Sequence, residues 1–300
     1  MNEQMPYAAQ PIQPAAPKKK LKRHFILWVP LIALAMILLG QILGSILVGL
    51  CAGVFLPNLS DGAKFLLQYL SFIGIDLLVI LYCALCEKPV GRSFLGAKHG
   101  GMCGNTLGQF ALGLLWGFVL NGVCILVAWL HKDLDFSVGR FDAVYMICAL
   151  VSVCVQSGAE ELVTRGYMMG ALRERYNVWV AIIVNSLFFG ALHLLNTGIT
   201  VLSFANIVLI GFAFSMLVYC FDSLWMCIAL HTAWNFTQNF LFGLPNSGIV
   251  SQSSFLHLEA ARHSVFYDAV FGIEGTITAV IVVGLFTVLV IVRGRKKVRA

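Results

Sequence analysis

Residues Gly158–Arg175 read Gly-Ala-Glu-Glu-Leu-Val-Thr-Arg-Gly-Tyr-Met-Met-Gly-Ala-Leu-Arg-Glu-Arg and come just after the apolar run Ala143–Val155. That run resembles half of a membrane span, so Glu160, Glu161 and Arg165 fall at membrane depth. Ionisable side chains at that depth cost about 2.5–3.5 kcal/mol each on insertion scales, and they usually face the protein interior. The stretch therefore predicts a polar site inside a membrane protein.

Composition supports a polytopic membrane protein. Of the 300 residues, 59% are hydrophobic and 11% are charged, whereas an average soluble domain is about 25% charged. The net charge of +6 is concentrated in residues 18–23 and 293–299, which flank apolar segments, so it does not indicate a nucleic-acid partner. The nine cysteines lie mostly in apolar runs and are expected to pack as small hydrophobic residues.

The hydrophobic pattern predicts an all-α polytopic fold with about eight transmembrane helices around a polar cavity. The expected spans are roughly residues 24–55, 64–86, 105–130, 143–165 or longer, 177–195, 199–221, 223–242 and 271–293. Residues 1–23 are polar and rich in proline, and we expect a disordered cytoplasmic tail there. Residues 24–300 are expected to form a single domain. Gly-x-x-x-Gly spacings predict close helix contacts at Gly40, Gly44, Gly49 and Gly53, and again at Gly113 and Gly117.

The charged loops predict an orientation in the cell membrane. Lys and Arg gather in the N-terminal cluster, in residues 87–99, at the tip that holds Arg173 and Arg175, and at the C terminus. Cytoplasmic loops carry an excess of these residues. The pattern therefore predicts a multi-pass protein with both termini in the cytoplasm and with residues 244–268 as the longest external loop. We expect the tip itself to be solvated.

Helix geometry separates the two adjacent acids. A helix turns about 100° per residue, so Glu160 and Glu161 point to different faces. Arg165 lies four residues after Glu161 and can pair with it. Glu160 is left on a face flanked by Gln156 and Thr164, which can only form hydrogen bonds. This arrangement suits a carboxyl group that works as an acid or base.

Further polar residues lie in later spans. His193 follows a Phe-Phe-Gly-Ala-Leu run, whereas His231 and Asn235 lie four residues apart and share a helix face that Asn239 extends. Glu160 and His193 are equally far from the turn candidate Tyr176-Asn177, so an antiparallel hairpin places both about 23 Å from its tip. This requires the fourth span to continue to about residue 175. His231 can share that depth, which we expect to be nearer the cytoplasmic side. Four other polar residues within spans are expected to form interhelical hydrogen bonds: Asp76, Asn121, Asn185 and Asn206. Of these four residues, Asn185 is the strongest candidate to line the cavity.

The ordered motifs Glu160-Glu161-x-x-x-Arg165, Phe189-x-x-x-His193 and His231-x-x-x-Asn235 resemble those of the CPBP (Abi) family. This family contains the type II CAAX prenyl endopeptidases and bacteriocin-processing proteases. The resemblance implies that Glu160 and His193 activate a water, and that His231 and Asn235 bind the oxyanion or complete a metal site. It also implies that Glu161 and Arg165 are a structural pair within a catalytic core of residues 143–242.

The cofactor and the substrate stay open at this point. Glu160, His193 and His231 are the candidate ligands of a Zn²⁺ ion, and metal-free hydrolysis is equally compatible with them. The resemblance implies an intramembrane endopeptidase acting on a membrane-associated or lipidated protein or peptide, either a CAAX-type chain or a bacteriocin or pheromone precursor. Its expected partners are this substrate and membrane lipids, not nucleic acid. The alternatives are a proton-coupled transporter and a non-catalytic immunity or scaffold protein that uses the same cavity.

Overall fold

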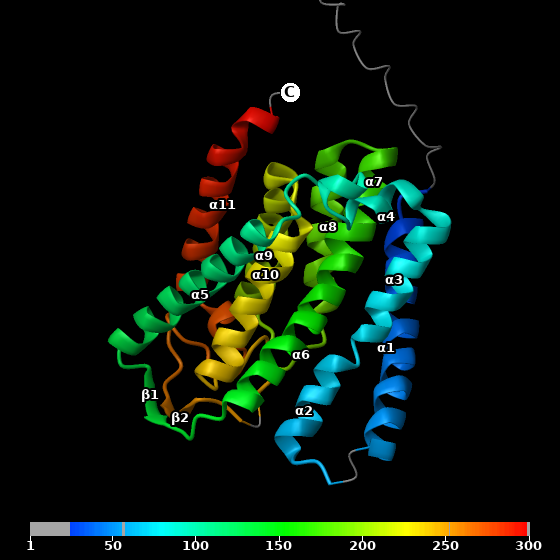
Figure 1. Cartoon of the computed structure of the whole chain (residues 1–300). Helices are drawn as coiled ribbons and strands as arrows, with labels where there is room; N and C mark the ends of the chain where they lie inside the picture. Colours follow the sequence, from blue (N-terminus) through cyan, green and yellow to red (C-terminus); the bar gives the residue numbers. More distant parts are fainter. Residues whose placement is uncertain (1–24, 56–57, 252, 299–300) are drawn as a thin grey trace, which may run out of the picture.

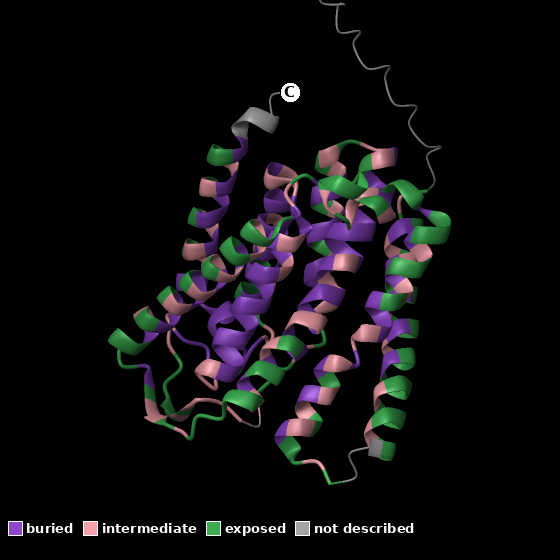
Figure 2. Ribbon diagram, viewed as in Figure 1, coloured by how far each residue is buried: buried purple, intermediate pink, exposed green. Residues whose placement is uncertain are grey.

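The computed structural model describes residues 25–55, 58–251 and 253–298. The tail predicted at residues 1–23 lies outside them. Within the described ranges, the chain forms a bundle of helices with a small two-stranded sheet at one end (Figure 1). Buried residues concentrate in the central helices of the bundle, while the outward faces of the peripheral helices are exposed (Figure 2). The predicted all-α polytopic membrane fold is confirmed, with the sheet as an addition that the sequence did not indicate.

The helices match the expected spans closely. Their bounds are α1 Trp28–Phe55, α2 Asp61–Leu70, α3 Ile73–Cys86, α4 Lys88–Ser93, α5 Leu107–Leu130, α6 Ala143–Glu161, α7 Met169–Arg175, α8 Val178–Leu192, α9 Val201–Phe221, α10 Leu224–Phe236 and α11 Ile277–Val298. The strands are β1 Leu134–Val138 and β2 Leu256–Ala261. Short 3₁₀ turns occupy Ala97–His99 and Ile273–Gly275, and π-helical turns occupy Leu162–Met168 and Thr237–Leu241.

Six helical stretches of the described residues are long and apolar enough to cross a membrane. One of them, Ala143–Arg175, joins α6 and α7 through a π-helical turn, so the fourth span does continue to the hairpin tip. Three expected spans differ from the prediction. The second is divided into α2 and α3, and the fifth is the short helix α8 of 15 residues, which ends at Leu192 rather than at residue 195. The seventh, expected over residues 223–242, is the 13-residue helix α10 followed by a π-helical turn, and it is not among the six stretches.

Polar residues begin most of these helices. Each capping side chain accepts a hydrogen bond from a backbone amide three residues along the chain, which satisfies one of the free donors of the first turn. The capping residues are Ser60 for α2, Thr106 for α5, Asp142 for α6, Asn177 for α8, Thr200 for α9 and Ser223 for α10. The cap at Asn177 places the turn between α7 and α8 at the predicted Tyr176-Asn177 pair.

Glycines allow two pairs of helices to approach closely. A Cβ atom on Gly44 would lie 1.7 Å from the Ser71 carbonyl oxygen, and one on Gly117 would lie 2.3 Å from the Leu230 carbonyl oxygen. The predicted contacts are therefore confirmed for α1 with α3 and for α5 with α10. The prediction is wrong for Gly49 and Gly53, because both face open space.

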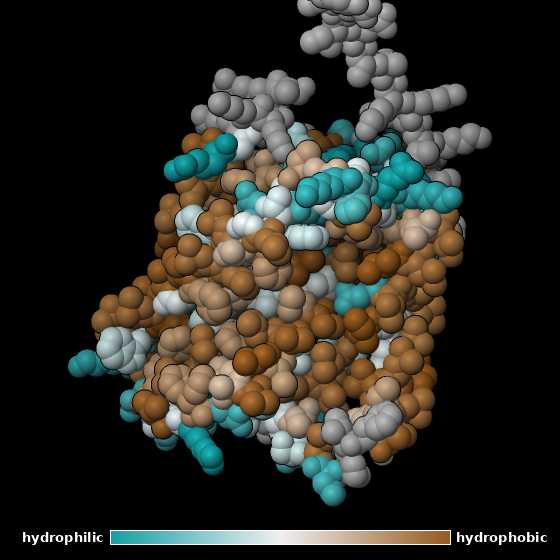
Figure 3. All heavy atoms as spheres, viewed as in Figure 1, coloured by the Kyte–Doolittle hydropathy of each residue, from teal (hydrophilic) through white to brown (hydrophobic). Residues whose placement is uncertain are grey.

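The loops gather at two opposite ends of the bundle. At one end, which we call the strand end, β1 pairs antiparallel with β2, so residues 131–142 and 244–268 lie together. At the other end, called the basic end, Arg175 Nη2 lies 2.6 Å from Glu87 Oε1. Arg175 is therefore buried in an ion pair, and the expectation of a fully solvated tip is wrong for this residue. Hydrophilic residues lie at both ends and a hydrophobic band separates them (Figure 3).

Candidate active site

Arg165 and Glu161 form a fully buried ion pair in the middle of the bundle. Arg165 Nη1 lies 3.0 Å from Glu161 Oε1, which confirms the predicted i,i+4 contact. Arg165 Nη2 also donates to the Gly211 carbonyl oxygen at 3.0 Å, and the guanidinium group lies over the rings of Phe189 and Phe214. A buried charge pair is stable only when its remaining hydrogen-bonding groups find partners, and these contacts supply several of them.

Glu161 has a second partner that the sequence did not indicate. His231 Nδ1 lies 2.9 Å from Glu161 Oε1, and the Cys227 thiol donates to Glu161 Oε2 at 3.1 Å. An ionised carboxylate can only accept hydrogen bonds, so Nδ1 of His231 carries the proton of this contact. The other ring nitrogen, Nε2, then points to Glu160, whose Oε2 lies 3.8 Å away. Glu161 therefore holds the ring of His231 as well as Arg165.

Glu160 is the member of the acidic pair that reaches open space. Its side chain is 22% exposed, and its Oε1 accepts a hydrogen bond from Gln156 Nε2 at 2.5 Å. Gln156 Oε1 in turn accepts from Asn235 Nδ2 at 3.3 Å, so one amide links the acid to the predicted oxyanion donor. Thr164 does not flank the carboxyl group as expected, because its hydroxyl donates to the backbone carbonyl oxygen of Glu160.

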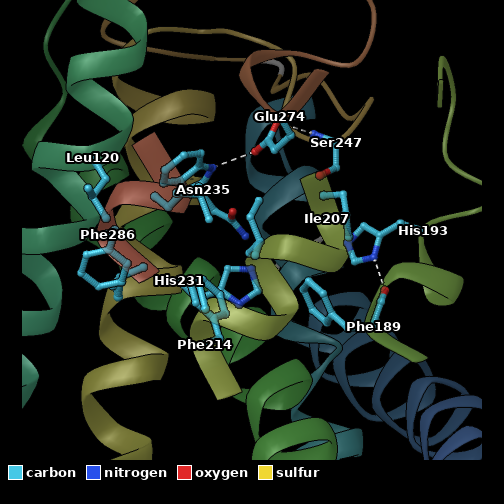
Figure 4. A pocket seen from close by; sticks show the side chains of 15 residues that line it. Leu120, Phe189, His193, Ile207, Phe214, His231, Asn235, Ser247, Glu274 and Phe286 are labelled. Carbon is cyan, nitrogen blue, oxygen red and sulfur yellow. Dashed lines mark hydrogen bonds between the residues drawn. The ribbon is translucent and has the colours of Figure 1, made fainter. Parts of the chain in front are cut away.

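His193 lies at the end of α8, where the chain leaves the helix. Its Nδ1 donates to the Phe189 carbonyl oxygen at 2.8 Å, which leaves Nε2 for other partners. Figure 4 shows His231 and Asn235 on α10, with His193 across the pocket from these two residues. Among the described residues, an ion-pair contact to Glu160 is found for His231 and none is found for His193. The structure thus brings His231 nearest to the acid, although the sequence paired Glu160 with His193.

A cavity of about 690 Å³ joins the four predicted catalytic residues. Glu160, His193, His231 and Asn235 lie along one side of it, together with Gln156. The opposite side comes from the first three helices and is mainly apolar, with Ile37, Leu38, Ile42, Phe65, Phe72 and Ile75. The prediction that these catalytic residues share one depth in the membrane is consistent with this arrangement.

The candidate zinc ligands do not fit a metal in this arrangement. Within the part of the chain that the structure describes, no group of three or more His, Cys, Asp or Glu side chains is placed to hold a metal ion. Nδ1 of each histidine is engaged by Phe189 or Glu161, which leaves Nε2 of each available, as in many zinc sites. A structural or catalytic zinc nevertheless needs three or four converging donors, and these side chains do not converge here. The zinc ion stays a prediction, and no step below depends on it.

Glu274 is a buried acid that sequence reasoning missed. It accepts hydrogen bonds from Trp234 Nε1 at 2.8 Å and from Gln238 Nε2 at 2.7 Å, both on the segment that carries His231 and Asn235. Figure 4 shows Glu274 also bonded to the amide of Ser247, which lies in the loop after α10. The only signal in the sequence was a single acid at the start of the last apolar run.

Four other polar residues were expected to form interhelical hydrogen bonds. Asn121 donates to Gln238, Asn185 to Ser215 and Asn206 to the Glu274 carbonyl oxygen. Asn185 is therefore not a cavity residue, contrary to expectation. Asp76 is buried, and its Oδ1 has no hydrogen-bond partner among the described residues.

Asn239 does not extend the face of His231 and Asn235. The π-helical turn Thr237–Leu241 follows α10 and changes the register, so the side chain of Asn239 bonds the carbonyl oxygens of Leu244 and Ile249. A second π-helical turn follows Glu161 directly. Such turns are rare in proteins, and those that occur are often found at functional sites.

Comparison with known families supports the motif assignment. Residues 142–237 match the family model described as type II CAAX prenyl endopeptidase Rce1-like. This range runs from the cap of α6 to the first residue after α10 and contains all three motifs. Comparisons with curated proteins and with solved structures gave no match. The segment that carries the candidate active site is therefore similar to the Rce1-like type II CAAX prenyl endopeptidases, as the resemblance to CAAX proteases predicted.

Proposed function

We propose that this multi-pass membrane protein is an intramembrane endopeptidase in which Glu160 activates the water that hydrolyses a peptide bond. The observation that carries the proposal is the different environment of the two adjacent acids. Glu161 is fully buried and paired, whereas Glu160 reaches a cavity that His193, His231 and Asn235 also line. The match of this segment to a protease family supports the same conclusion.

The reaction begins with water held between Glu160 and the histidines. The Glu160 carboxylate takes a proton from the water, whose oxygen attacks the carbonyl carbon of the substrate. When the C–N bond of the tetrahedral intermediate breaks, Glu160 returns the proton to the leaving nitrogen. A general base placed in this way contributes about 10²–10⁴-fold to the rate.

Asn235 and His231 stabilise the negative charge that develops on the substrate oxygen. The side-chain amide of Asn235 is a neutral donor at every pH, and a positioned oxyanion donor contributes about 10²–10³-fold. His231 acts beside it as a doubly protonated ring, in which Nδ1–H donates to Glu161 and Nε2–H donates to the substrate oxygen. A fixed ring costs no reorganisation in the transition state, which gives the buried Glu161–Arg165 pair a role in positioning.

The loops support an orientation for this site. We propose that the basic end lies in the cytoplasm, with both termini, because the loop 87–99 and the hairpin tip carry the excess of Lys and Arg. The substrate is a membrane-associated or lipidated peptide. CAAX-type chains and secreted peptide precursors are the two classes to be tested.

The experiment compares Glu160→Gln with Glu174→Gln in proteoliposomes. The probes are an internally quenched farnesylated CAAX peptide and an unprenylated, membrane-inserted peptide with the same fluorophores. We expect Glu160→Gln to lower cleavage of whichever probe is accepted by about 10²–10⁴-fold, and Glu174→Gln, at the hairpin tip, to leave it unchanged. Cleavage by Glu160→Gln at the original rate would refute the proposal.

The same preparation tests the zinc prediction. Metal analysis of the purified protein and cleavage before and after treatment with a zinc chelator give independent readouts. Bound zinc together with loss of cleavage would show that Glu160, His193 and His231 rearrange to hold the ion. Full activity in metal-free protein would establish hydrolysis by the side chains alone.

A further inference from the structure

The cavity occupies only one half of the bundle. The helix Ala143–Arg175 runs from the strand end to the basic end, and among its residues Gln156 and Glu160 line the cavity while none after Glu160 does. The lining continues from there toward the strand end, through Phe65 and Tyr69 of α2 and through residues 246–249 after α10. The sequence placed the site nearer the basic end, but the cavity extends in the other direction.

The other half is closed by packed side chains. Arg165 lies one turn beyond Glu160 toward the basic end, and its guanidinium group is 4.3 Å from the centre of the Phe189 ring and 5.4 Å from that of Phe214. Tyr167 and Met168 are also buried there. Side chains in this density leave no path for a peptide, because protein interiors are packed about as tightly as organic crystals.

The cavity reaches the surface beside α1. Leu38 and Ile42 line it and are nevertheless more than half exposed, and Ile249, which also lines it, is 48% exposed. Leu192 and Asn196, at the end of α8 and in the turn that follows it, also line the cavity. We call this opening, between α1 and the α8–α9 turn, the side opening. Its exposed residues are apolar, so it faces lipid rather than water.

The polar groups along the cavity beyond the catalytic residues are uncharged. Gln41, Gln68, Asn196, Asn246 and Ser247 offer amides and a hydroxyl, and the described lining residues include no lysine or arginine. Amides and hydroxyls can bond the backbone of an extended peptide. A free C-terminal carboxylate would find no cationic partner among them, and an unpaired buried charge is costly.

From these observations we propose that the cavity takes an uncharged, apolar segment inside a membrane-inserted peptide, and that this segment enters from lipid through the side opening, in the half of the bundle nearer the strand end. This proposal rests on the proposed protease function. It deepens that function by naming the route and the chemistry of the substrate segment.

The first test places a large side chain in the side opening. Leu38 and Leu39 are neighbours on α1 and are 58% and 60% exposed, but Leu38 lines the cavity and Leu39 does not. With the membrane-inserted reporter peptide as substrate, we expect Leu38→Trp to lower kcat/KM about tenfold or more and Leu39→Trp to leave it unchanged. Equal rates for the two variants would overturn the route. Since Glu160→Gln is measured in parallel, a protein that needs Glu160 but ignores Leu38→Trp would refute this inference and leave the proposed function intact.

The second test does not depend on catalysis. A cysteine introduced by Ser247→Cys, in a protein whose exposed cysteines 51, 86, 103 and 148 are changed to serine, is labelled with a membrane-impermeant thiol reagent in oriented vesicles. Glu259→Cys on β2 and Arg173→Cys at the hairpin tip report the two sides. We expect Ser247→Cys to be labelled from the same side as Glu259→Cys. Labelling only from the side of Arg173→Cys would overturn the proposal.

The third test concerns the substrate segment. In the reporter peptide, one apolar residue next to the cleaved bond is replaced by lysine or by glutamine. We expect lysine to abolish cleavage and glutamine, which is polar but uncharged, to preserve most of it. Equal cleavage of the lysine and glutamine peptides would contradict an uncharged segment.

Discussion

The two halves of the bundle treat neighbouring residues of one helix in opposite ways. In the half toward the basic end, Glu161 and Arg165 are fully buried and contact each other, His231 and two aromatic rings. In the half toward the strand end, Glu160 faces a cavity; its carboxyl group accepts a hydrogen bond from Gln156 and lies 3.8 Å from His231. The comparison teaches that one helical turn can supply both a rigid support and a reactive group, because the helix places adjacent residues on different faces.

The largest expected effect is on the stability of the packed half of the bundle, toward the basic end. Arg165→Met leaves Glu161 charged and buried without its main partner, and breaking such a pair typically costs about 3–5 kcal/mol. We expect a strongly lowered Tm in detergent, whereas Arg173→Met, at the exposed tip, should change it little. The double variant Glu161→Gln with Arg165→Met should recover part of the loss. An unchanged Tm for Arg165→Met alone would show that the pair does not support this half.

The next effect separates rate from stability. Asn235→Ala removes the proposed oxyanion donor, so we expect cleavage to fall about 10²–10³-fold. Asn185→Ala serves as the matched change, because Asn185 bonds Ser215 away from the cavity. It should cost about 0.5–1.5 kcal/mol of stability by removing the hydrogen bond that the Ser215 hydroxyl accepts, since this hydroxyl still donates to the Gly211 carbonyl oxygen, and it should have little effect on kcat. Equal losses of rate in the two variants would argue against a role for Asn235 in the transition state.

A smaller effect concerns α1, which forms part of the cavity wall in the half toward the strand end. Gly44 lies against α3, so Gly44→Ala must push α1 away from Ser71 and Gly74, and overpacking of this kind costs about 1–3 kcal/mol. Gly49→Ala on the same helix meets open space and should cost nothing. Tm measurements in detergent compare the two. A Tm for Gly44→Ala at or above that of Gly49→Ala would be inconsistent with the close contact.

The smallest effect is a pH dependence at the strand end. Burial alone would raise the pKa of Asp133, but hydrogen bonds from Ser264, Arg262 and His131 outweigh it and hold the pKa below its ordinary value. The stabilisation is therefore complete above about pH 3.9, the ordinary value, and is lost as the pH falls through the lowered one. These contacts join the start of β1 to the end of β2.

Protease cleavage of residues 256–264 measures this contact. We expect protection at neutral pH that falls at strongly acidic pH, and we expect Asp133→Asn to be less protected already at neutral pH. Protection that increases on acidification would contradict the assigned direction of the pKa shift.

Many contacts in both halves of the bundle could be predicted from the sequence, because they follow from the periodicity of single helices and hairpins. The Glu161–Arg165 contact needs only the i,i+4 spacing. The turn at Tyr176-Asn177 and the common cavity of Glu160 and His193 need only residue counting along two antiparallel helices. The catalytic roles of these residues stay predictions for the variants above to test.

The remaining contacts depend on how helices rotate and pack, which spacing does not determine. His231 lies 70 positions from Glu161, and Trp234 lies 40 positions from Glu274. The two π-helical turns alter the register after Glu161 and after Phe236, so Asn239 turned away from the expected face. The pairing of β1 with β2 joins two loops whose sequences show no clear strand pattern.

The most direct test of the division between the two acids is to measure Tm and cleavage of the membrane-inserted reporter for Glu160→Gln and Glu161→Gln side by side. We predict that Glu160→Gln keeps the Tm of the unaltered protein and loses cleavage. Glu161→Gln should lower the Tm clearly, because it leaves Arg165 charged and buried. Retained cleavage by Glu160→Gln, or an equal fall in Tm for both variants, would contradict the account.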